Sequence, residues 1–430
     1  MRVTDAKLIV CSPGRSLAAR KRKRVWLIAA WLLSGAVAAE GQNAPPRPAG
    51  PPRVFVLDGT ALQNLRDAIA AGRGHEPALD ALRAAADRAL KQPLLSVTQK
   101  QQVPPSGDKH DYMSVAPYWW PDPSKPNGLP YIRRDGETNP EIERVPDQRN
   151  FARLMSSAHT LALAYFLFHE EAYAVHAAGL LRAWFLDPST RMNPHLQFAQ
   201  AVLGRNEGRG IGLIETRGLG RVVDALGLLA GSRAWTAADQ KGMQDWLSKF
   251  LAWMQENSNG KAEANAKNNH GTYYDIQVIS LALFTGNAEL AKRVLQDVPK
   301  KRIAMQVEPD GRQPLELQRT KSLGYSTMNL SGLFELARLG EHVGVDLWNL
   351  QTSDGRGLRK ALDFLVPYVT SAKKWPYPQI EEYKASEIVP MLLMAADRYH
   401  APGYAEAAAK AVPAAAQSFD ALLIRLRKRD

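Results

Sequence analysis

Cysteine is almost absent from the 430-residue chain, which contains Cys11 alone. A single cysteine cannot form an intramolecular disulfide, and it cannot build a metal site from several thiolates. Because Cys11 lies in a segment that we expect to be removed on export, the mature protein would have no thiol nucleophile either. The fold must therefore be stabilised by core packing, for which a chain of this length is sufficient.

Long hydrophobic runs are also missing, and the one marked apolar stretch lies near the N-terminus. Residues 25–39 are apolar, follow the basic run 20–24 and end in small residues. This order is typical of a secretory signal peptide, and the apolar run is short for a transmembrane helix. We expect residues 1–39 to be a signal peptide, 40–53 a Pro-rich linker and 54–430 a single domain. The mature protein would be periplasmic or secreted, with no stable membrane insertion.

A strong excess of one charge is missing once this segment is set aside. The chain has a net charge of +12, but residues 1–39 contain eight Lys and Arg residues and one Asp, so their removal would lower it to +5. This mild charge permits an acidic ligand without identifying one. There is no P-loop, no His-Glu-x-x-His motif and no Gly-x-Ser-x-Gly elbow. No motif indicates nucleic-acid binding, and the sequence does not determine an oligomeric state.

Alternating strand patterns are rare, and residues 53–57 are the best of them. Helical spacing of apolar residues is frequent, and Thr236-Ala-Ala-Asp239 resembles a helix N-terminal cap. We therefore predict an all-α fold of antiparallel helix pairs. An α/α toroid and an open helical array both fit the pattern. The helical segments are 62–69, 79–90, 161–168, 222–229, 243–254, 276–284, 288–295, 330–343, 358–369, 385–399 and 414–426.

Two segments interrupt the helical pattern. Residues 106–149 form a long stretch rich in Pro, Gly, Asp and aromatic residues, and residues 265–274 read Asn-Ala-Lys-Asn-Asn-His-Gly-Thr-Tyr-Tyr. Long loops within a compact domain are usually functional or disordered, and the aromatic residues of the first argue against disorder. Functional residues are therefore expected in these two segments.

Asn269-His270 and Arg319 with Tyr325 provide side-chain types that suit one kind of reaction. Amide, imidazole and guanidinium groups can neutralise a carboxylate, while a phenol or an imidazole can transfer protons. Removal of the C5 proton of a uronate and expulsion of the oxygen at C4 require these groups, and they require no metal or other cofactor. An acidic polysaccharide cleaved by β-elimination would be such a substrate.

Several motifs, in the same order along the chain, resemble the alginate lyase domain family. They are Asn-Asn-His-Gly-Thr-Tyr-Tyr-Asp-Ile-Gln at 268–277, the segment 315–326, and the loop 111–122 with 128–136 behind it. The resemblance implies an incomplete α/α toroid whose long loops cover a deep cleft. It also implies metal-independent elimination on an alginate-like or polymannuronate-like polymer.

By this resemblance, Asn269 would bind the uronate carboxylate, and Arg319 would assist it and hold the phenol of Tyr325. Tyr325 would transfer protons. His270 would neutralise the carboxylate or, for the C5 epimer, act as the base. Ser326 departs from the pattern, because the best-known members have His directly after the catalytic Tyr. This leaves open which uronate polymer is cleaved, and whether cleavage is endo or exo.

Further polar and aromatic residues are candidates for substrate contacts, because sugar rings stack on aromatic faces and carboxylates bind polar groups. They lie in the long loop, beside the catalytic motif, or in the segment 193–209. These candidates are His110, Tyr112, Tyr118, Trp119, Trp120, Arg133, Arg134, His195, Gln200, Arg209 and Asn268.

Other interpretations of the same residues stay open at this point. A glycoside hydrolase would need two carboxyl groups, for which Asp122 and Glu316 are available. A non-catalytic glycan-binding protein could use the aromatic loop alone. The Asn-Asn-His-Gly segment could also be an ordinary turn between helices, Tyr325 a core residue and Arg319 a surface ion-pair partner.

Overall fold

The computed structural model describes residues 50–427. The chain divides into two units, Met1–Ala44 and Pro45–Asp430, and the following description concerns the second unit alone. The predicted signal peptide, Cys11 and most of the predicted linker lie outside the described residues. Arg53, at the end of that linker, is described, and its guanidinium donates a hydrogen bond to the carbonyl oxygen of Leu283 (2.9 Å).

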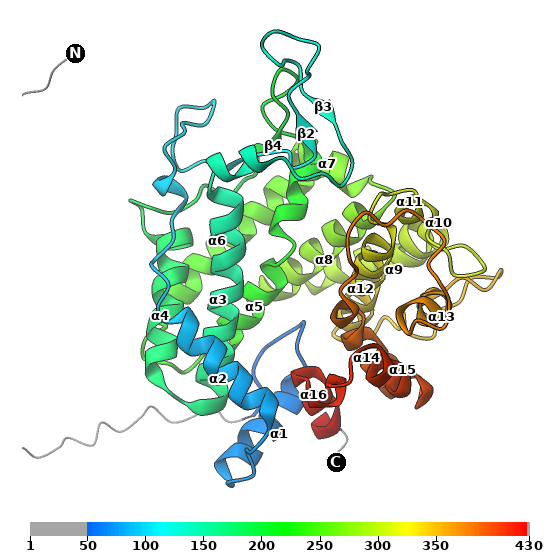
Figure 1. Cartoon of the computed structure of the whole chain (residues 1–430). Helices are drawn as coiled ribbons and strands as arrows, with labels where there is room; N and C mark the ends of the chain where they lie inside the picture. The colour runs from blue at the N-terminus through cyan, green and yellow to red at the C-terminus, as the bar shows by residue number, and fades with distance from the viewer. Residues whose placement is uncertain (1–49, 428–430) are drawn as a thin grey trace, which may run out of the picture. The chain divides into compact units, whose positions relative to one another are not determined.

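Helices make up most of the described part of the chain, as the apolar spacing predicts (Figure 1). None of the helices within residues 50–427 is both long enough and apolar enough to span a membrane. Their bounds are α1 Gly59–Ala70, α2 Pro77–Ala89, α3 Asp147–Phe168, α4 Glu171–Leu181, α5 Leu219–Leu228, α6 Ala237–Glu256, α7 Ser258–Ala264, α8 Asn269–Phe284, α9 Ala288–Val298, α10 Ala304–Gln306, α11 Pro314–Leu317, α12 Ser322–Glu341, α13 Leu358–Val369, α14 Val389–Arg398, α15 Gly403–Ala411 and α16 Phe419–Arg427.

The one helix start predicted from a capping signal agrees with the structure. Thr236 and Asp239 form a capping box, in which each side chain accepts a hydrogen bond from the other's backbone N–H, and α6 begins after Thr236. The segment expected as one helix over 385–399 is instead a 3-10 turn, Ala385–Glu387, followed by α14. Pro390 explains this break, because proline fits only the first turn of a helix.

The strand pattern at residues 53–57 does not form a strand. The backbone N–H groups of Phe55, Val56 and Leu57 donate to the carboxylate of Asp224, with distances of 2.6 Å for Phe55 and 2.7 Å for Leu57. Asp224 is fully buried on α5. These donors are thus satisfied by a side chain instead of a neighbouring strand, which the local sequence could not indicate.

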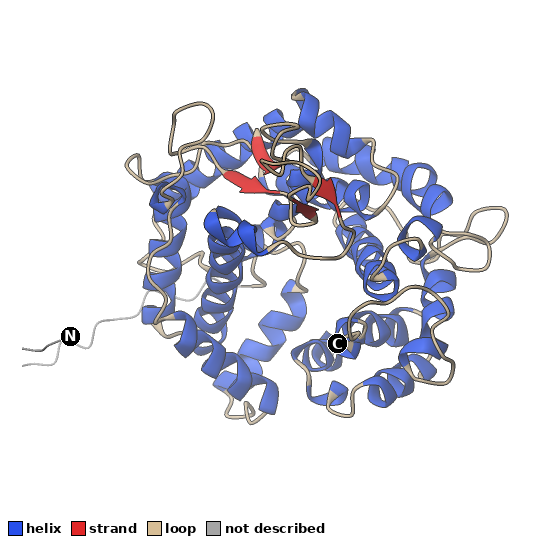
Figure 2. Cartoon of the chain, turned by 45° about the horizontal axis from the view of Figure 1, so that its top comes forward, coloured by secondary structure: helices blue, strands red, loops and turns tan. Residues whose placement is uncertain are grey.

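The helices of the second unit follow one another around a ring (Figure 2). Helices α3, α5, α8 and α12 pack against each other in that order, and α16 packs against both α14 and α1, which returns to α3. A second layer covers this ring, since α4 packs on α3, α9 on α8, α13 on α12 and α15 on α14. The architecture is an α/α toroid of antiparallel helical hairpins, which confirms that prediction over the open array.

Four short strands lie together at one end of the helices (Figure 1). They are β1 Met113–Val115, β2 Trp119–Trp120, β3 Ile132–Arg133 and β4 Phe198–Ala201. Strand β1 pairs with β4 in parallel, and β2 pairs with β3 antiparallel, with Trp119 opposite Arg133. The long loop predicted at 106–149 thus contains three strands, and its aromatic residues are held in defined positions.

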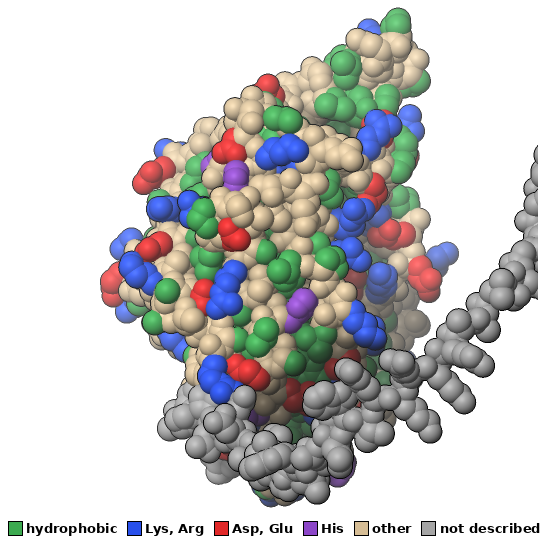
Figure 3. Space-filling view, turned by 90° about the vertical axis from the view of Figure 1, so that its left-hand side faces the viewer, with side chains coloured by type: hydrophobic (Ala, Val, Ile, Leu, Met, Phe, Trp, Pro, Cys, Tyr) green, Lys and Arg blue, Asp and Glu red, His purple; other side chains and the backbone are tan. Residues whose placement is uncertain are grey.

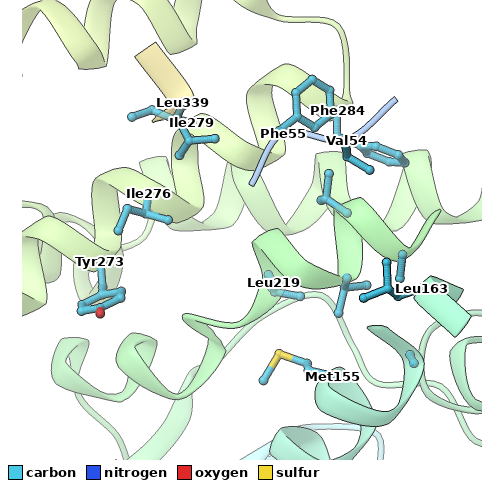
Figure 4. Close-up of a cluster of buried hydrophobic side chains, with 14 of the residues drawn as sticks. Val54, Phe55, Met155, Leu163, Leu219, Tyr273, Ile276, Ile279, Phe284 and Leu339 are labelled. Atoms are coloured by element: carbon cyan, nitrogen blue, oxygen red, sulfur yellow. The ribbon is translucent and has the colours of Figure 1, made fainter. Parts of the chain in front are cut away.

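The core is one continuous cluster of apolar side chains between the helices. Figure 4 shows part of it, where Met155 of α3, Leu219 of α5 and Ile276 of α8 are drawn with their neighbours. Burial of each such side chain contributes about 1.5–3 kcal/mol to the free energy of unfolding. This packing holds the N-terminus of α8 and the start of α12 in fixed positions, and both carry predicted catalytic residues.

Candidate active site

A cleft of about 550 Å³ is bordered by the four strands, the N-terminus of α8 and the start of α12. The segment 265–274 contributes to it, but only its first residues are a turn. Helix α8 already begins at Asn269, and the side chain of Asn268 caps it by accepting a hydrogen bond from the N–H of His270 (3.3 Å). The N-terminal end of a helix favours negative charge, so an anion in this part of the cleft is stabilised.

Asn269 is fixed by a buried carboxylate beneath it. Its backbone N–H and its side-chain Nδ2 donate to the two oxygens of Glu316, each at 2.8 Å. Burial raises the pKa of Glu316, while the two hydrogen bonds from Asn269 oppose this effect. Because one of the two Nδ2 hydrogens is bound by Glu316, the amide nitrogen is oriented as a donor, and its second hydrogen is available to a ligand.

His270 is oriented by a second buried carboxylate. Its Nδ1 lies 2.6 Å from Oε1 of Glu263, which is 1% exposed at the end of α7. A carboxylate accepts a hydrogen bond, so the proton of the neutral imidazole lies on Nδ1, and Nε2 carries the lone pair. His270 lines the cleft, and Nε2 has no hydrogen-bond partner within residues 50–427. The ring can therefore accept a proton from a ligand at Nε2.

Tyr325, in the first turns of α12, is held from two sides. Its hydroxyl accepts a hydrogen bond from Nη2 of Arg319 (2.8 Å) and is 2.9 Å from the hydroxyl of Tyr118. The guanidinium of Arg319 also lies over the Tyr325 ring, 3.8 Å from its centroid. Burial raises the pKa of Tyr325, and the hydrogen bond with Tyr118 raises it further, while Arg319 lowers it. The phenol is therefore protonated at neutral pH.

The position of Arg319 is fixed by Asp135 of the long loop. Nε and Nη2 of Arg319 donate to the carboxylate of Asp135, at 3.1 Å and 2.8 Å, and the N–H and hydroxyl of Thr320 donate to it as well. Partial burial alone would raise the pKa of Asp135, but the hydrogen bonds from Arg319 and Thr320 hold it well below its usual range. The carboxylate is thus ionised, and it compensates the charge of Arg319.

Positive charge predominates among the residues that border the cleft. Arg133, Arg209, Arg217 and Arg319 line it, and Glu215 is the one acidic side chain among the described lining residues. The outer face in Figure 3 differs, because Lys, Arg, Asp and Glu are interspersed there. The cleft therefore suits a ligand that carries several negative charges.

Glu215 is buried in the cleft wall. Its Oε2 accepts hydrogen bonds from the hydroxyls of Tyr112 and Ser114, both at 2.7 Å. Burial raises its pKa to about 7, although these hydrogen bonds lower it. Glu215 therefore changes its protonation state near neutral pH.

Ten of the residues predicted from the sequence line this one cleft, although they come from distant parts of the chain. Trp119 and Arg133 are cross-strand partners in β2 and β3, which places their side chains on the same side of that ribbon. The ten residues are Tyr118, Trp119, Arg133, Gln200, Arg209, Asn268, Asn269, His270, Arg319 and Tyr325.

Five predicted substrate-binding residues are not among the lining residues, and each has a different contact. Tyr112 is fully buried and donates to Glu215. Nδ1 of His110 is 2.6 Å from the carbonyl of Arg191, and Nε2 of His195 is 2.9 Å from Asp111. Nε1 of Trp120 donates to the carbonyl of Glu137 (3.0 Å), while the guanidinium of Arg134 lies over the Trp120 ring. Adjacent residues of a strand point to opposite faces, so Trp120 lies away from the cleft that Trp119 lines.

Several residues of the site were not found by reasoning from the sequence. Glu263, Asp135 and Glu215 hold or surround the predicted groups, and Arg217 lines the cleft. The two carboxyl groups considered for a hydrolase do not flank the cleft. Asp122 binds Ser124 in an exposed turn, and Glu316 lies buried beneath Asn269.

Comparisons with known proteins agree with this fold. The family model "Alginate lyase" matches residues 96–375. An alginate lyase from Bacteroides ovatus has 39% sequence identity and a TM-score of 0.83, over 87% of this chain and 99% of that one. Alginate lyase A1-III from Sphingomonas species A1 has 17% identity and a TM-score of 0.52, over 80% and 90% of the two chains, and shares the fold. A search of curated proteins found no match.

The helical toroid with its cleft and these likenesses define the class of protein, a polysaccharide lyase. Within that class, the chain belongs to the alginate lyase family. Its substrate is accordingly a polysaccharide.

Proposed function

We propose that the chain cleaves an acidic, uronate-containing polymer of the alginate type by β-elimination in this cleft. The observation that carries the proposal is that Tyr325, held by Arg319 and Tyr118, borders the same cleft as the Asn269–His270 pair. The Asn269–His270 pair suits a carboxylate, and the hydroxyl of Tyr325 suits a leaving oxygen. The arginines of the cleft walls favour a polyanion over a neutral polymer.

In the proposed reaction, the uronate carboxylate binds at the N-terminus of α8. The free Nδ2 hydrogen of Asn269 and the positive end of the helix stabilise the negative charge that develops when the C5 proton leaves. The electrons of the C5–H bond form the C4–C5 double bond, and the bond from C4 to the glycosidic oxygen breaks. That oxygen takes a proton from the phenol of Tyr325, which burial keeps protonated.

The group that accepts the C5 proton depends on the configuration at C5. Where the C5 hydrogen and O4 lie on opposite faces of the sugar, Nε2 of His270 accepts the proton and Tyr325 donates one. Where both lie on the same face, Tyr325 reacts as a phenolate, after its proton has passed to solvent. It accepts the C5 proton and returns it to the leaving oxygen, while His270, protonated at Nε2, helps to neutralise the carboxylate. Asn268, Tyr118, Trp119, Arg133, Gln200 and Arg209 are proposed to contact the substrate.

Arg319 has a narrower role in this proposal than the family resemblance implied. Its charge is compensated by Asp135, and one of its N–H groups holds the Tyr325 hydroxyl. We therefore assign it mainly to the position of the phenol. The neutralisation of the substrate carboxylate rests on Asn269 and His270.

The experiment that tests the proposal is ultraviolet absorbance during incubation of the mature protein with a panel of uronate polymers, with a metal chelator present. A rising signal from the new C4–C5 double bond is expected, and the responding polymer identifies the substrate. New reducing ends without this absorbance would instead indicate hydrolysis. A signal that the chelator abolishes would contradict the metal-independent mechanism.

We also propose that residues 1–39 direct export and that residues 54–430 form one catalytic domain. The basic and apolar pattern of the first segment supports export to the periplasm or beyond. N-terminal sequencing of the exported protein would test this, with a new terminus near residue 40 as the expected result. An unprocessed terminus on cytoplasmic protein would contradict it.

A further inference from the structure

Arg209 is a cation of the cleft wall that is held by neutral groups. It lies just before the 3-10 turn Gly210–Thr216, and its Nε donates to the carbonyl oxygen of Gln200 (3.1 Å). Its Nη2 donates to the side-chain oxygen of the same residue (3.0 Å). These two contacts fix the guanidinium in place, and because neither is with a carboxylate, its positive charge is not balanced by an ion pair.

Other arginines of the described chain have their charge balanced by an aspartate. Arg319 is paired with Asp135 at 2.8 Å, and Arg302 is paired with Asp275 at 2.7 Å. Arg209 has no carboxylate within ion-pair distance in residues 50–427. Burial lowers the pKa of Arg209, and the nearby Arg133 lowers it further, while Glu215 and Glu263 act in the opposite direction. A partly buried charge without an opposite charge in contact is costly, so an anionic ligand would relieve this cost.

Gln200, which holds Arg209, is itself tightly fixed. It is 5% exposed, and its N–H donates to the hydroxyl of Ser114 in β1 (2.7 Å). Its φ of 51° lies in the left-handed region, which costs a non-glycine residue about 1–3 kcal/mol. In this backbone conformation, both the carbonyl oxygen and the side-chain oxygen of Gln200 accept hydrogen bonds from Arg209. The guanidinium is therefore preorganised before any ligand binds.

Trp119 provides an apolar surface next to this cation. The guanidinium carbon of Arg209 is 5.7 Å from the centroid of the Trp119 ring, and both side chains line the cleft. A uronate residue is complementary to these two side chains. Its apolar C–H face suits the Trp119 ring, and the carboxylate on C5 suits the guanidinium of Arg209. The reacting uronate already has Asn269 and His270 for its carboxylate.

We propose that Arg209 and Trp119 form a second carboxylate-binding subsite, which holds a uronate residue next to the one that undergoes elimination. Arg209 binds the carboxylate through its free N–H groups, and Trp119 contacts the sugar ring. Gln200, which also borders the cleft, positions the guanidinium of Arg209. This inference rests on the proposed function, since it assumes that the cleft binds a chain of uronates.

The test compares Arg209→Gln with Arg205→Gln. Arg205 is the matched control, because it is exposed and its guanidinium lies 5.1 Å from the Trp119 ring, but it does not line the cleft. In steady-state kinetics, Arg209→Gln should raise KM about tenfold or more and leave kcat within about threefold, as expected for loss of a charge-assisted contact formed equally in ground and transition states. Arg205→Gln should change both constants by less than about twofold.

A binding measurement separates this inference from the elimination reaction. In a Tyr325→Phe background, a uronate tetrasaccharide and its carboxyl-methylated form are titrated by calorimetry. Arg209→Gln should weaken binding of the acidic tetrasaccharide about tenfold or more and change binding of the methyl ester little. Arg209→Lys keeps the positive charge but lacks the planar guanidinium. Its affinity for the acidic tetrasaccharide should lie between those of the wild type and Arg209→Gln.

Equal losses for both ligands, or no loss for either, would overturn the subsite. A fall in kcat with unchanged KM would also overturn it, because Arg209 would then act on the reacting residue. If the wild-type protein forms no double bond on any polymer but binding still depends on Arg209 and on the carboxylates, the proposed elimination fails and the subsite stands.

Discussion

Replacement of Tyr325 by Phe removes one oxygen atom and tests the proposed reaction most directly. The hydroxyl makes two hydrogen bonds, with Arg319 at 2.8 Å and with Tyr118 at 2.9 Å. Each hydrogen bond of this kind contributes about 0.5–1.5 kcal/mol, so the variant should lose about 1–3 kcal/mol of stability. Arg319 keeps its ion pair with Asp135, and the phenyl ring keeps its contact with the guanidinium, so the variant should fold.

The loss of activity should be larger than the loss of stability. Proton transfer by a positioned group contributes about 10²- to 10⁴-fold to a rate, which corresponds to about 3–5 kcal/mol of the barrier. Initial rates of double-bond formation should therefore fall by at least a hundredfold or so. Affinity for a uronate oligosaccharide, measured by calorimetry, should stay within about threefold of the wild type, because the ring is retained.

Two results would refute this reasoning. A rate near the wild-type value would remove Tyr325 from the chemistry, and a joint loss of folding, binding and activity would make it a core residue. Thermal unfolding of the two proteins distinguishes these cases. A Tyr118→Phe variant serves as a comparison, because it removes one partner of the Tyr325 hydroxyl and leaves that hydroxyl in place.

The remaining predictions concern the carboxyl groups and the amide of the site. Asn269→Ala should lower kcat about a hundredfold, as loss of an oxyanion donor does, and an unchanged rate would exclude it. Glu263→Gln should lower kcat about tenfold or more, with a changed tautomer of His270 in ¹⁵N NMR, and an unaltered spectrum would contradict this. Because burial raises the pKa of Glu215 from 4.5 to about 7, folding favours its protonated form, and wild-type stability should fall as the pH rises from about 4.5 to about 7. Glu215→Gln should remove on the order of 3 kcal/mol of that fall, measured by denaturant unfolding at about pH 5 and about pH 8.

The sequence was sufficient for the fold class, and the principal residues that it predicted for the site line one cleft. Helical spacing of apolar residues predicted most of the long helices, because a helix that packs on one face repeats its apolar residues every three or four positions. It was weaker for α4, most of whose residues are buried, so that no polar face marks it. Asn269 with His270, and Arg319 with Tyr325, were predicted from their side-chain chemistry and from two short segments that resemble the family.

Residues in strands were harder to assign. Trp119 and Trp120 were both predicted to contact substrate, as were Arg133 and Arg134. The structure separates each pair, since successive side chains of an extended segment point in opposite directions. Two-residue strands have too little alternation in their sequence to indicate which face is the inner one.

Only the tertiary structure decided how the proposed catalytic groups are held and charged. Asp135 is 184 positions from Arg319, and Glu316 is 47 positions from Asn269, so no local pattern connects them. The sequence by itself determined which side chains are available and which segments are helical. The protonated state of Tyr325, the compensated charge of Arg319 and the uncompensated charge of Arg209 depend on burial and on neighbours from other loops and strands. Those properties arise when the toroid packs, because electrostatic interactions act through space rather than along the chain.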